Sequence, residues 1–527
     1  MRPLPFFPVR RTGLILAVIA AMLALPTVAS GAALVQLAPN DSWGSSPIHG
    51  ASPPGDPRLF VVERGGGVRV VENGVLRPAP FLTVPNVDTV GERGLLSIAF
   101  APDYAASGLF YIFTVAKGPD AFGGAAGDLR LIEYRRSTAD PNLADPGSAR
   151  LVFALAHGAP THNGGQIAFG PDGLLYLTVG DNANSANAQD FTNLYGKVLR
   201  IDPRQQPGGA PYGLPASNPF AAAPPARPEI YALGLRNPFR ASFSPGGDLI
   251  VADVGQSTWE EVNVGRATGT PAATTLAGAN LGWPICEGAC ATPGLLNPFF
   301  QYDNGETPRQ TTGCAVLGGY VVRDRSLTGL TGRYLYADAC REDLRSLDLA
   351  VPGADPQPTG MVLPGGNEPL GLGEDGRGCV YVMATGTAFR VAPGAGAAAA
   401  CPEAAVTGAA DTTPPRLSLS GSHRQPPRRS LRVFAICDES CSLLASAKPR
   451  FSGAKASAKG PPVSRRSAAA GQRVRLTVKL RRKALRRAKQ VLAHGGKVVV
   501  PARVTATDAS GNGSQKVFRI RLRTPRP

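Results

Sequence analysis

The side chain best suited to acid–base chemistry lies in the run Thr161-His162-Asn163-Gly164-Gly165-Gln166. His162 stands directly before the apolar residues 167–169, and these lead into the turn Gly170-Pro171-Asp172-Gly173. An imidazole titrates near neutral pH, so it can accept a proton from a substrate hydroxyl under physiological conditions. A histidine at the mouth of a strand unit predicts a catalytic base. The alternative is a histidine that only caps the strand or donates to a backbone carbonyl.

The strand-and-turn pattern after His162 recurs along the first 400 residues. Pro and Asp-Gly favour tight turns, and alternating apolar residues on either side bury one face of a strand. Six segments share the pattern, namely residues 58–63, 98–113, 167–180, 241–255, 332–347 and 370–383. Four of them contain a turn, at residues 101–104, 170–173, 244–247 and 373–376.

These repeats predict an all-β fold, and in particular a six-bladed β-propeller. Units that cannot bury their own faces must stack or close into a ring, and radial closure protects strand edges. Gly and Pro supply 113 of 527 residues, as suits a fold rich in turns. A tandem of β-sandwiches is the alternative, and the single extended run of similar units argues against it.

Charge divides the chain into two unequal parts. Residues 411–527 contain 27 Lys and Arg against 4 Asp and Glu, a net charge of +23. The whole chain carries +17, so residues 1–410 carry 17 − 23 = −6. The basic character therefore belongs to the C-terminal part alone.

The N-terminus has the features of a secretion signal. Arg2, Arg10 and Arg11 flank or precede an apolar run from Leu14 to Leu25, and residues 29–32 are small enough for a cleavage site. The sequence predicts a signal peptide over residues 1–32, no transmembrane segment after cleavage, and a secreted or cell-surface protein. An uncleaved N-terminal anchor is the alternative.

Three further boundaries follow from composition. Residues 33–395 form the expected propeller. Residues 396–415 are rich in Ala, Gly, Thr and Pro, which is typical of a linker. Residues 416–527 form the expected basic C-terminal domain.

Strand alternation in this basic domain predicts an immunoglobulin-like β-sandwich. The expected strands are 430–436, 473–480, 497–506 and 516–523, and residues 481–492 form one short basic helix. A cationic domain of an exported protein suits an anionic cell-wall polymer and not a nucleic acid. A soluble accessory domain without a partner is the alternative.

The eight cysteines favour disulfides, because the count is even and the chain is expected to be exported. Proximity in the sequence suggests four pairs, although connectivity does not follow from sequence: Cys286–Cys290, Cys314–Cys340, Cys379–Cys401 and Cys437–Cys441. Zinc at Cys286 and Cys290 is the alternative, and no Cys-x-x-Cys pair or nearby histidine completes a tetrahedral set.

Six motifs follow one another between residues 91 and 321. They are Gly91-Glu92-Arg93-Gly94-Leu95-Leu96 with residues 99–103, His162-Asn163-Gly164-Gly165, residues 230–238 ending in Arg236-Asn237-Pro238, Ala252-Asp253-Val254-Gly255-Gln256 with Glu260-Glu261, Asn280-Leu281-Gly282-Trp283-Pro284, and Gly318-Gly319-Tyr320-Val321. In this order they resemble the glucose/sorbosone dehydrogenase family over roughly residues 35 to 395. That family contains soluble quinoprotein sugar dehydrogenases with a six-bladed propeller.

The resemblance implies a site that holds pyrroloquinoline quinone and calcium. His162 would take the proton of a sugar hydroxyl while hydride passes to the quinone, and Arg236 would stabilise the negative charge that develops there. Contacts to the cofactor are implied for Glu92, Asn163, Arg236 and Asn237. The backbone carbonyls of Gly255 and Gln256 match the loop that binds calcium.

The resemblance also implies a cationic clamp on the cofactor carboxylates, and this sequence departs from it. The family's glucose enzyme uses a lysine and two arginines in the fifth and sixth blades. Alignment places Cys340 at the lysine and Glu368 near the arginines. Arg341 and Arg345 are the cations that can take over this role.

Two principal functions remain open. The first is an exported oxidoreductase that oxidises an aldose or related sugar alcohol and passes electrons to an external acceptor. The second is a non-catalytic extracellular propeller that binds carbohydrate or protein after losing the clamp. A metal-dependent hydrolase or lactonase lacks a compelling ligand set.

Two residue assignments carry structural alternatives. Arg236 can be an ion-pair partner between blades, for example with Glu229. Glu260 and Glu261 are expected to lie in a solvated loop and not in a metal site.

Overall fold

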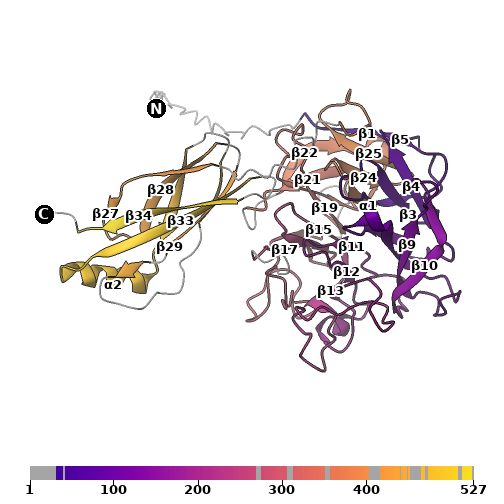
Figure 1. The fold of residues 1–527 in the computed structure, drawn as a ribbon, viewed down its shortest axis with the longest axis horizontal. Helices are drawn as coiled ribbons and strands as arrows, with labels where there is room; N and C mark the ends of the chain where they lie inside the picture. Colours follow the sequence, from indigo (N-terminus) through magenta and orange to yellow (C-terminus); the bar gives the residue numbers. More distant parts are fainter. Residues whose placement is uncertain are drawn as a thin grey trace, which may run out of the picture.

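The computed structural model describes residues 31–39, 42–268, 274–304, 313–350, 356–402, 416–438, 441–447, 449–451, 464–468, 473–508 and 513–524. Most of the predicted signal peptide and most of the predicted linker lie outside these residues. Figure 1 shows a large body built from the indigo to orange part of the chain and a smaller body built from the yellow C-terminal part.

The large body is a six-bladed propeller, as predicted. Its inner strands β2, β7, β11, β15, β19 and β23 contact one another in a closed ring. Blade 1 contains β2 (Pro47–Ala51), β3 (Leu59–Glu63), β4 (Gly67–Glu72), β5 (Val75–Leu76) and β6 (Leu82–Thr83). Blade 2 contains β7 (Leu95–Phe100), β8 (Leu109–Val115), β9 (Leu129–Arg136) and β10 (Ala144–Leu155), with α1 (Tyr104–Ser107) between its first two strands.

The next three blades each have four antiparallel strands. Blade 3 contains β11 (Ile167–Phe169), β12 (Leu175–Val179), β13 (Lys197–Ile201) and β14 (Ile230–Leu233). Blade 4 contains β15 (Pro238–Phe243), β16 (Leu249–Asp253), β17 (Trp259–Gly265) and β18 (Phe300–Asp303). Blade 5 contains β19 (Val316–Val321), β20 (Tyr334–Asp338), β21 (Asp343–Leu347) and β22 (Gln357–Val362).

The sixth blade joins the two ends of the propeller. It contains β23 (Pro369–Glu374), β24 (Val380–Ala384) and β25 (Thr387–Ala392), and its outer strand is the N-terminal β1 (Ala33–Gln36). Two 3-10 turns, η2 (Ser185–Gln189) and η3 (Pro364–Gly366), lie in loops. Four repeats found in the sequence are the two inner strands of a blade. Residues 58–63 are a second strand, and residues 332–347 are the second and third strands of blade 5.

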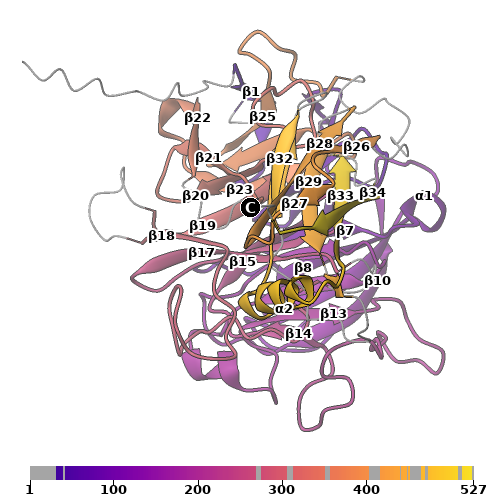
Figure 2. The same ribbon diagram turned by 90° about the vertical axis from the view of Figure 1, so that its left-hand side faces the viewer.

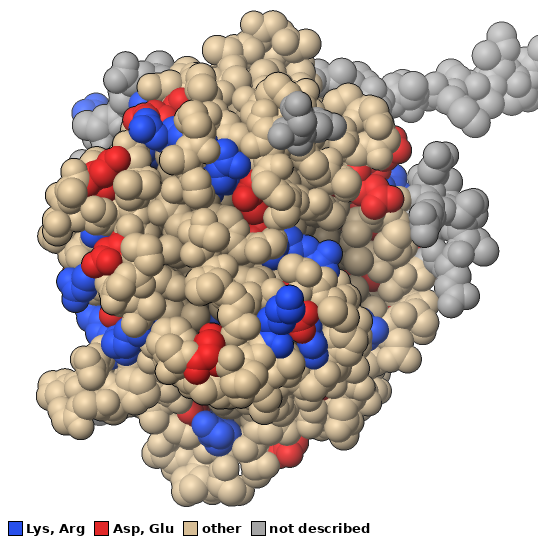
Figure 3. All heavy atoms as spheres, turned by 90° about the vertical axis from the view of Figure 1, so that its right-hand side faces the viewer, with Lys and Arg blue, Asp and Glu red and all other residues tan. Residues whose placement is uncertain are grey.

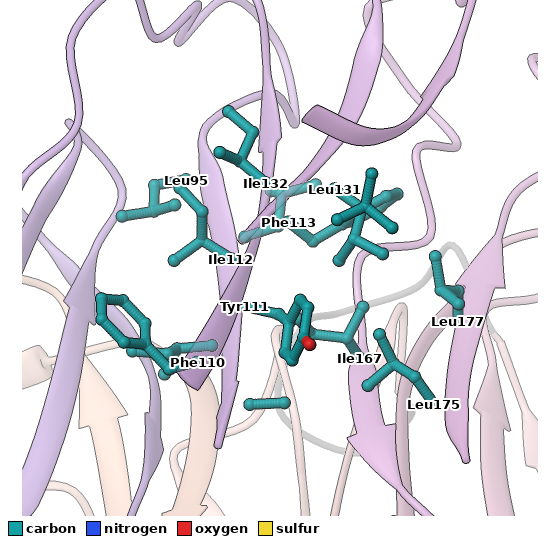
Figure 4. Packing of buried hydrophobic residues seen from close by; sticks show 14 of the residues in the cluster. Leu95, Phe110, Tyr111, Ile112, Phe113, Leu131, Ile132, Ile167, Leu175 and Leu177 are labelled. Atoms are coloured by element: carbon teal, nitrogen blue, oxygen red, sulfur yellow. The ribbon is translucent and has the colours of Figure 1, made fainter. Parts of the chain in front are cut away.

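Apolar side chains fill the space between blades on both faces of each sheet. Strand β8 is buried along its whole length, because alternate residues meet different neighbours. Phe110 contacts Phe81 of blade 1, whereas Tyr111 contacts Phe169 of blade 3. Figure 4 shows Tyr111 beside Ile167 at this junction. Continuous apolar strands are therefore required here, and they hold the loops at the ends of the strands in fixed positions.

The C-terminal body has two sheets that share one hydrophobic cluster. The first contains β26 (Leu417–Ser420), β28 (Ser430–Cys437) and β32 (Val474–Lys479). The second contains β27 (Arg424–Gln425), β34 (Gly513–Leu522), β33 (Val498–Asp508), β29 (Cys441–Ala447), β31 (Ser464–Ala468) and β30 (Arg450–Phe451). The predicted basic helix is α2 (Arg482–Ala493). Assignment of this unit to the immunoglobulin-like class stays a prediction.

All four cysteine pairs suggested by sequence proximity form disulfides, Cys286–Cys290, Cys314–Cys340, Cys379–Cys401 and Cys437–Cys441. A structural zinc at Cys286 and Cys290 is thereby excluded. In the described part of the chain, no helix has the length and apolarity needed to cross a membrane.

Candidate functional site

The loops that carry the candidate residues meet at one end of the propeller. In an antiparallel blade, the start of the inner strand and the connection between the second and third strands lie at the same end. His162 and Asn163 precede β11, and Arg236 and Asn237 precede β15. Asp181 follows β12. The tertiary structure thus places residues from blades 3 and 4 on one rim.

His162 is paired with a carboxylate that sequence reasoning missed. Its ring Nδ1 lies 2.7 Å from Oδ1 of Asp181, and the His162 side chain is 16% exposed against 2% for Asp181. The other Asp181 oxygen accepts a hydrogen bond from Nε1 of Trp283 at 2.9 Å. A carboxylate at Nδ1 fixes the tautomer, so that Nε2 is the atom able to accept a proton.

Two glycines let the histidine reach this position. A Cβ on Gly180 would lie 2.0 Å from the His162 carbonyl oxygen, and a Cβ on Gly164 would lie 2.5 Å from the carbonyl oxygen of Thr178. His162 itself has φ of 56°, in the left-handed region that few residues with a side chain adopt. The surrounding structure must hold this conformation, as is common at functional sites.

His157 supports the same loop. This buried side chain places Nε2 3.0 Å from the His162 carbonyl oxygen and Nδ1 3.0 Å from that of Ala159. Burial lowers the pKa of His157, while the two carbonyl contacts oppose this shift. The His157 ring therefore holds the backbone of His162, whose own side chain is partly exposed.

Glu92 and Asn237 tie the histidine loop to blades 2 and 4. One Glu92 oxygen accepts the backbone N–H of His162 at 2.9 Å and Nδ2 of Asn237 at 3.1 Å. The amide oxygen of Asn237 accepts the backbone N–H of Gly164 at 3.0 Å. Both ends of the Asn237 amide are thus used in holding the site together.

Arg236 lies beside the Asp181–Trp283 pair. Its guanidinium carbon is 5.9 Å from the centre of the Trp283 ring, and Nη1 donates to the carbonyl of Val254 at 3.1 Å. Nε is buried without a hydrogen-bond partner among the described residues. The suggested ion pair with Glu229 is wrong, because Glu229 is held by Arg227 at 2.9 Å.

Asn163 is buried behind His162, and its side chain is only loosely held. Its Nδ2 donates to the Pro160 carbonyl at a long 3.4 Å. Its amide oxygen has no partner within the described ranges. Asn163 and Arg236 thus both keep unused hydrogen-bonding capacity at the rim.

An aspartate recurs at the end of the second strand in blades 3, 4 and 5, and Asp181, the partner of His162, is one of them. Asp253 closes β16 and accepts the backbone N–H groups of Arg236 and Asn237 at 3.0 and 2.7 Å. Asp338 closes β20 and accepts the N–H of Cys314 in the same way. Asp181 stands at the matching place in blade 3, but it binds an imidazole. Burial raises the pKa of Asp253 well above its usual value, and Glu261 adds to this shift.

The predicted calcium loop is pinned by carboxylates. One oxygen of Glu287 accepts the backbone N–H groups of Gln256, Ser257, Thr258 and Trp259 at 2.8 to 3.1 Å. A trans peptide directs its C=O away from its N–H, so the carbonyls of Gly255 and Gln256 point away from Glu287. Burial opposes the charge of Glu287, yet these four donors hold its pKa below the usual value.

The expected solvent exposure of Glu260 and Glu261 is wrong. Both are buried, at 0% and 8% exposure. Glu260 accepts Nδ2 of Asn304 and the backbone N–H of Val316, at 2.7 and 2.8 Å. Glu261 accepts the N–H of Gly288 at 2.6 Å. Glu260 therefore holds Asn304 and the start of β19, and Glu261 holds the backbone at Gly288. Buried backbone donors need acceptors of this kind.

The residues expected at the cationic clamp are already engaged. Cys340 is bonded to Cys314. Arg341 makes a two-pronged contact with Asp343 at 2.8 and 3.2 Å, and Arg345 reaches the same carboxylate at 3.1 Å. Both arginines line a pocket of about 110 Å³ between blades 4 and 5.

Of the two carboxylates that sequence reasoning missed, Asp181 could have been found and Glu287 could not. Asp181 was detectable, because it follows an apolar strand as Asp253 and Asp338 do. Glu287 was not detectable, since only the folded chain shows that it meets residues 256–259.

The fold and the rim define a class of protein, a six-bladed propeller that presents a histidine–carboxylate pair beside a guanidinium. Residues 46–332 match the family described as Glucose / Sorbosone dehydrogenase, and the chain belongs to this family. The expectation drawn from the motifs is confirmed.

Curated relatives carry both enzyme and interaction names. The chain is 30% identical to the HIPL1 protein of Arabidopsis thaliana over 47% of this chain and 43% of that protein. It is 34% identical to human Hedgehog-interacting protein over 36% and 28%. It is 29% identical to Aldose sugar dehydrogenase YliI of Escherichia coli over 43% and 56%. The matched part of the chain thus spans less than half of HIPL1 and of Hedgehog-interacting protein.

Among solved structures, a PQQ-bound aldose sugar dehydrogenase from Streptomyces coelicolor has the same fold. The TM-score is 0.52 at 24% identity, over 69% of this chain and 99% of that one. At this identity the likeness speaks for the fold.

Proposed function

We propose that the protein is an exported sugar dehydrogenase that oxidises a hydroxyl of an aldose or related sugar alcohol, with pyrroloquinoline quinone and calcium as cofactors. The observation that carries this proposal is the pair formed by His162 and Asp181, with Nδ1 held at 2.7 Å and the ring partly open to solvent. A relative named aldose sugar dehydrogenase supports the substrate class.

The residues on the His162 side of the rim suit a bound quinone. Nε of Arg236 and Oδ1 of Asn163 are buried and unpartnered among the described residues, and a polar ligand would satisfy both. Glu92 and Asn237 would border the same ligand. The carbonyls of Gly255 and Gln256, which point away from Glu287, are hard oxygen ligands of the kind that calcium prefers. The quinone, when bound, supplies the hydride acceptor that side chains lack.

The protein's own residues would manage the proton and the charge. His162 accepts the hydroxyl proton at Nε2, since Nδ1 faces Asp181, and Asp181 stabilises the resulting imidazolium. Arg236 offers a fixed positive charge beside this base and would favour negative charge that develops on the ligand. The His162 ring and Asp181 already hold each other, and Arg236 is held by the Val254 carbonyl, so these three groups are in place before a ligand binds.

The clamp side of the rim does not suit the cofactor carboxylates. Arg341, our candidate for that role, is paired with Asp343, and Cys340 replaces a lysine. Anionic groups without cations lose affinity. Cofactor affinity should therefore be weaker than the full family clamp would provide.

The test is reconstitution of the purified chain with the quinone and calcium. Uptake is followed by absorbance, and turnover is followed by reduction of an artificial electron acceptor with aldoses. His162→Ala should abolish turnover and leave uptake intact. His494→Ala, an exposed histidine outside the propeller, is the control. Unchanged turnover in His162→Ala would remove this residue from the base role.

A non-catalytic binding propeller is the second candidate. The occupied clamp favours it, as does a relative named Hedgehog-interacting protein. Absence of quinone uptake together with absence of dye reduction would select this candidate. An extracellular carbohydrate or protein would then be the ligand.

Export and domain layout complete the proposal. Four disulfides that use all eight cysteines suit an oxidising compartment outside the cytoplasm. Residues 1–32 act as the signal peptide, 33–395 as the propeller, 396–415 as the linker and 416–527 as the accessory domain. Electrons would pass to an external acceptor.

A further inference from the structure

Helix α2 carries positive charge over its whole solvent face. Five of its twelve residues are exposed cations, and Arg481 precedes them: Arg482, Lys483, Arg486, Arg487 and Lys489. At 100° per residue these side chains cover an arc of roughly 160°. The helix lies on the side of the C-terminal body that faces away from the propeller in Figure 1 and toward the viewer in Figure 2.

The opposite face of α2 is used up in packing. Ala484 and Ala488 are buried, and Leu485, Val491 and Leu492 pack against the cluster shared by the two sheets. No apolar stripe remains for insertion into a bilayer, so α2 is unlike the interfacial helices that bind membranes. What it offers to a partner is charge.

The charge pattern works against the helix itself. The first turn holds Arg482 and Lys483 and no acid, although a helix N-terminus favours negative groups. Arg481 occupies the N-cap without a side-chain hydrogen bond. Arg482 and Arg486, as well as Lys483 and Arg487, are like charges four residues apart, which repel. A helix that breaks three local rules at once points to a function for its charges.

Nothing in the described part of this body neutralises these cations. Within those residues its one ion pair joins Arg416 to Asp438 at 4.0 Å. Arg487 lies over the ring of Phe451 at 5.1 Å, which orients it without cancelling its charge. On the propeller face drawn in Figure 3, by contrast, acidic and basic groups are interspersed.

We propose that α2 is the docking surface for a linear polysaccharide of the cell surface that carries a carboxylate on each sugar repeat. The pairs Arg482/Lys483 and Arg486/Arg487 lie one turn apart, about 6 Å along the axis, which is close to the length of a sugar repeat. Guanidinium groups bind carboxylates through two parallel hydrogen bonds. The choice of a surface polymer over nucleic acid rests on the export that is part of the proposed function, because nucleic acid is scarce outside the cytoplasm.

The experiment compares two variants of equal charge in the full-length protein. One replaces Arg482, Lys483, Arg486 and Arg487 with Gln, a good helix former. The matched control replaces four exposed strand cations with Thr, which suits strands: Arg432, Arg475, Arg519 and Arg521. Circular dichroism and thermal unfolding confirm that each variant is folded.

Binding is measured by calorimetry with polygalacturonate as the carboxylate probe, poly(glycerol phosphate) as the phosphate probe and duplex DNA for comparison. The helix variant should lose at least about tenfold in affinity for polygalacturonate. The strand variant should lose less than about threefold. Affinity of the unaltered protein should fall steeply between about 50 and 200 mM salt.

Three results would overturn the assignment. Equal losses in the two variants would mean that net charge acts without a docking surface. Tighter binding of DNA or of poly(glycerol phosphate) than of polygalacturonate at the same ionic strength would assign a different partner class. Absence of saturable binding to polygalacturonate would remove the site. None of these outcomes depends on the redox chemistry proposed for the propeller.

Discussion

At the scale of single residues, the site depends on a conformation that the histidine would not adopt alone. His162 sits at a positive φ, and its backbone is held by Glu92 on one side and His157 on the other. These contacts aim the ring at Asp181. A carboxylate that holds one imidazole nitrogen leaves the other free for chemistry.

Asp181→Asn tests this pairing. The amide keeps the shape of the side chain but removes the charge that stabilises a protonated ring, and it allows the wrong tautomer. We expect kcat to fall by roughly 10²- to 10⁴-fold, with KM changed by less than about threefold. Steady-state kinetics of the reconstituted protein measures both. Asp190→Asn, an exposed aspartate on the same segment, is the control. A large change in KM with constant kcat would contradict this role.

Gly164→Ala tests the close approach that brings the histidine loop to β12. Gly164 has φ of 66°, and a Cβ would lie 2.5 Å from a backbone oxygen. Gly173 is a matched control, since its φ is 75° and a Cβ there meets nothing within 4 Å. Backbone strain alone should cost about 1 to 2 kcal/mol in both variants.

The free energy of unfolding should therefore fall by more than about 3 kcal/mol in Gly164→Ala, because the loop must also move. Denaturant titration measures the difference between the two variants. Equal losses would show that the contact with Thr178 is easily relieved.

At the scale of elements, buried carboxylates hold the backbone at the points where strands and loops meet. Asp253 lies beside the start of β15, and Asp338 and Glu260 hold the backbone at the start of β19. Glu287 accepts the N–H groups of the loop after β16. Backbone donors in a loop that no strand satisfies need such acceptors. The acidic residues near the rim are thus largely structural.

Glu260→Gln gives a prediction for pH dependence. Burial raises the pKa of Glu260 from 4.5 to about 8. Between these values the folded chain holds a proton that the unfolded chain has lost, so stability falls as pH rises through this window. The variant lacks this titration. Its free energy of unfolding relative to the unaltered protein should rise across pH 4.5 to 8, by up to about 1.4 kcal/mol per pH unit.

Chemical denaturation at several pH values measures this difference. The slope is the quantity of interest, because Gln also changes the hydrogen bonds to Asn304 and Val316. A flat difference for Glu260→Gln would mean that Glu260 stays ionised in the folded protein.

At the scale of the whole molecule, closure joins elements that are far apart in sequence. Strand β1 completes blade 6 by pairing with β25. Across the centre, the buried guanidinium of Arg240 in blade 4 donates to the Ile48 carbonyl in blade 1 at 3.0 Å. The propeller is therefore closed by the β1–β25 pair in blade 6 and linked across its centre by Arg240.

Removal of β1 tests the seam. A chain that starts at Ser42 leaves the edge of β25 unpaired and loses the contact between Leu37 and Ala388. Compared with a chain that starts at Gly31, we expect a loss of about 3 to 5 kcal/mol from several missing hydrogen bonds and buried side chains. Thermal unfolding and light scattering measure stability and aggregation. Identical midpoints would show that β1 is dispensable.

The sequence by itself determined the architecture. Apolar alternation, Pro-Asp-Gly turns and the charge boundary near residue 411 are local properties, and each is readable from neighbouring residues. Alternation and turns predicted six blades and placed His162 directly before a strand. Proximity in the sequence suggested the four disulfide pairs without fixing them, and Arg236 and Asn237 were indicated by the family resemblance.

Only the tertiary structure decided which partner each side chain takes. Asp181 lies 19 residues after His162, and Glu287 lies 31 residues after Gln256, so no local pattern links them. Arg341 had several possible carboxylate partners, and folding gave it Asp343. Glu260 was expected in a solvated loop, yet packing buried it. Partner choice depends on distances and competition across blades, and these exist only once the ring has closed.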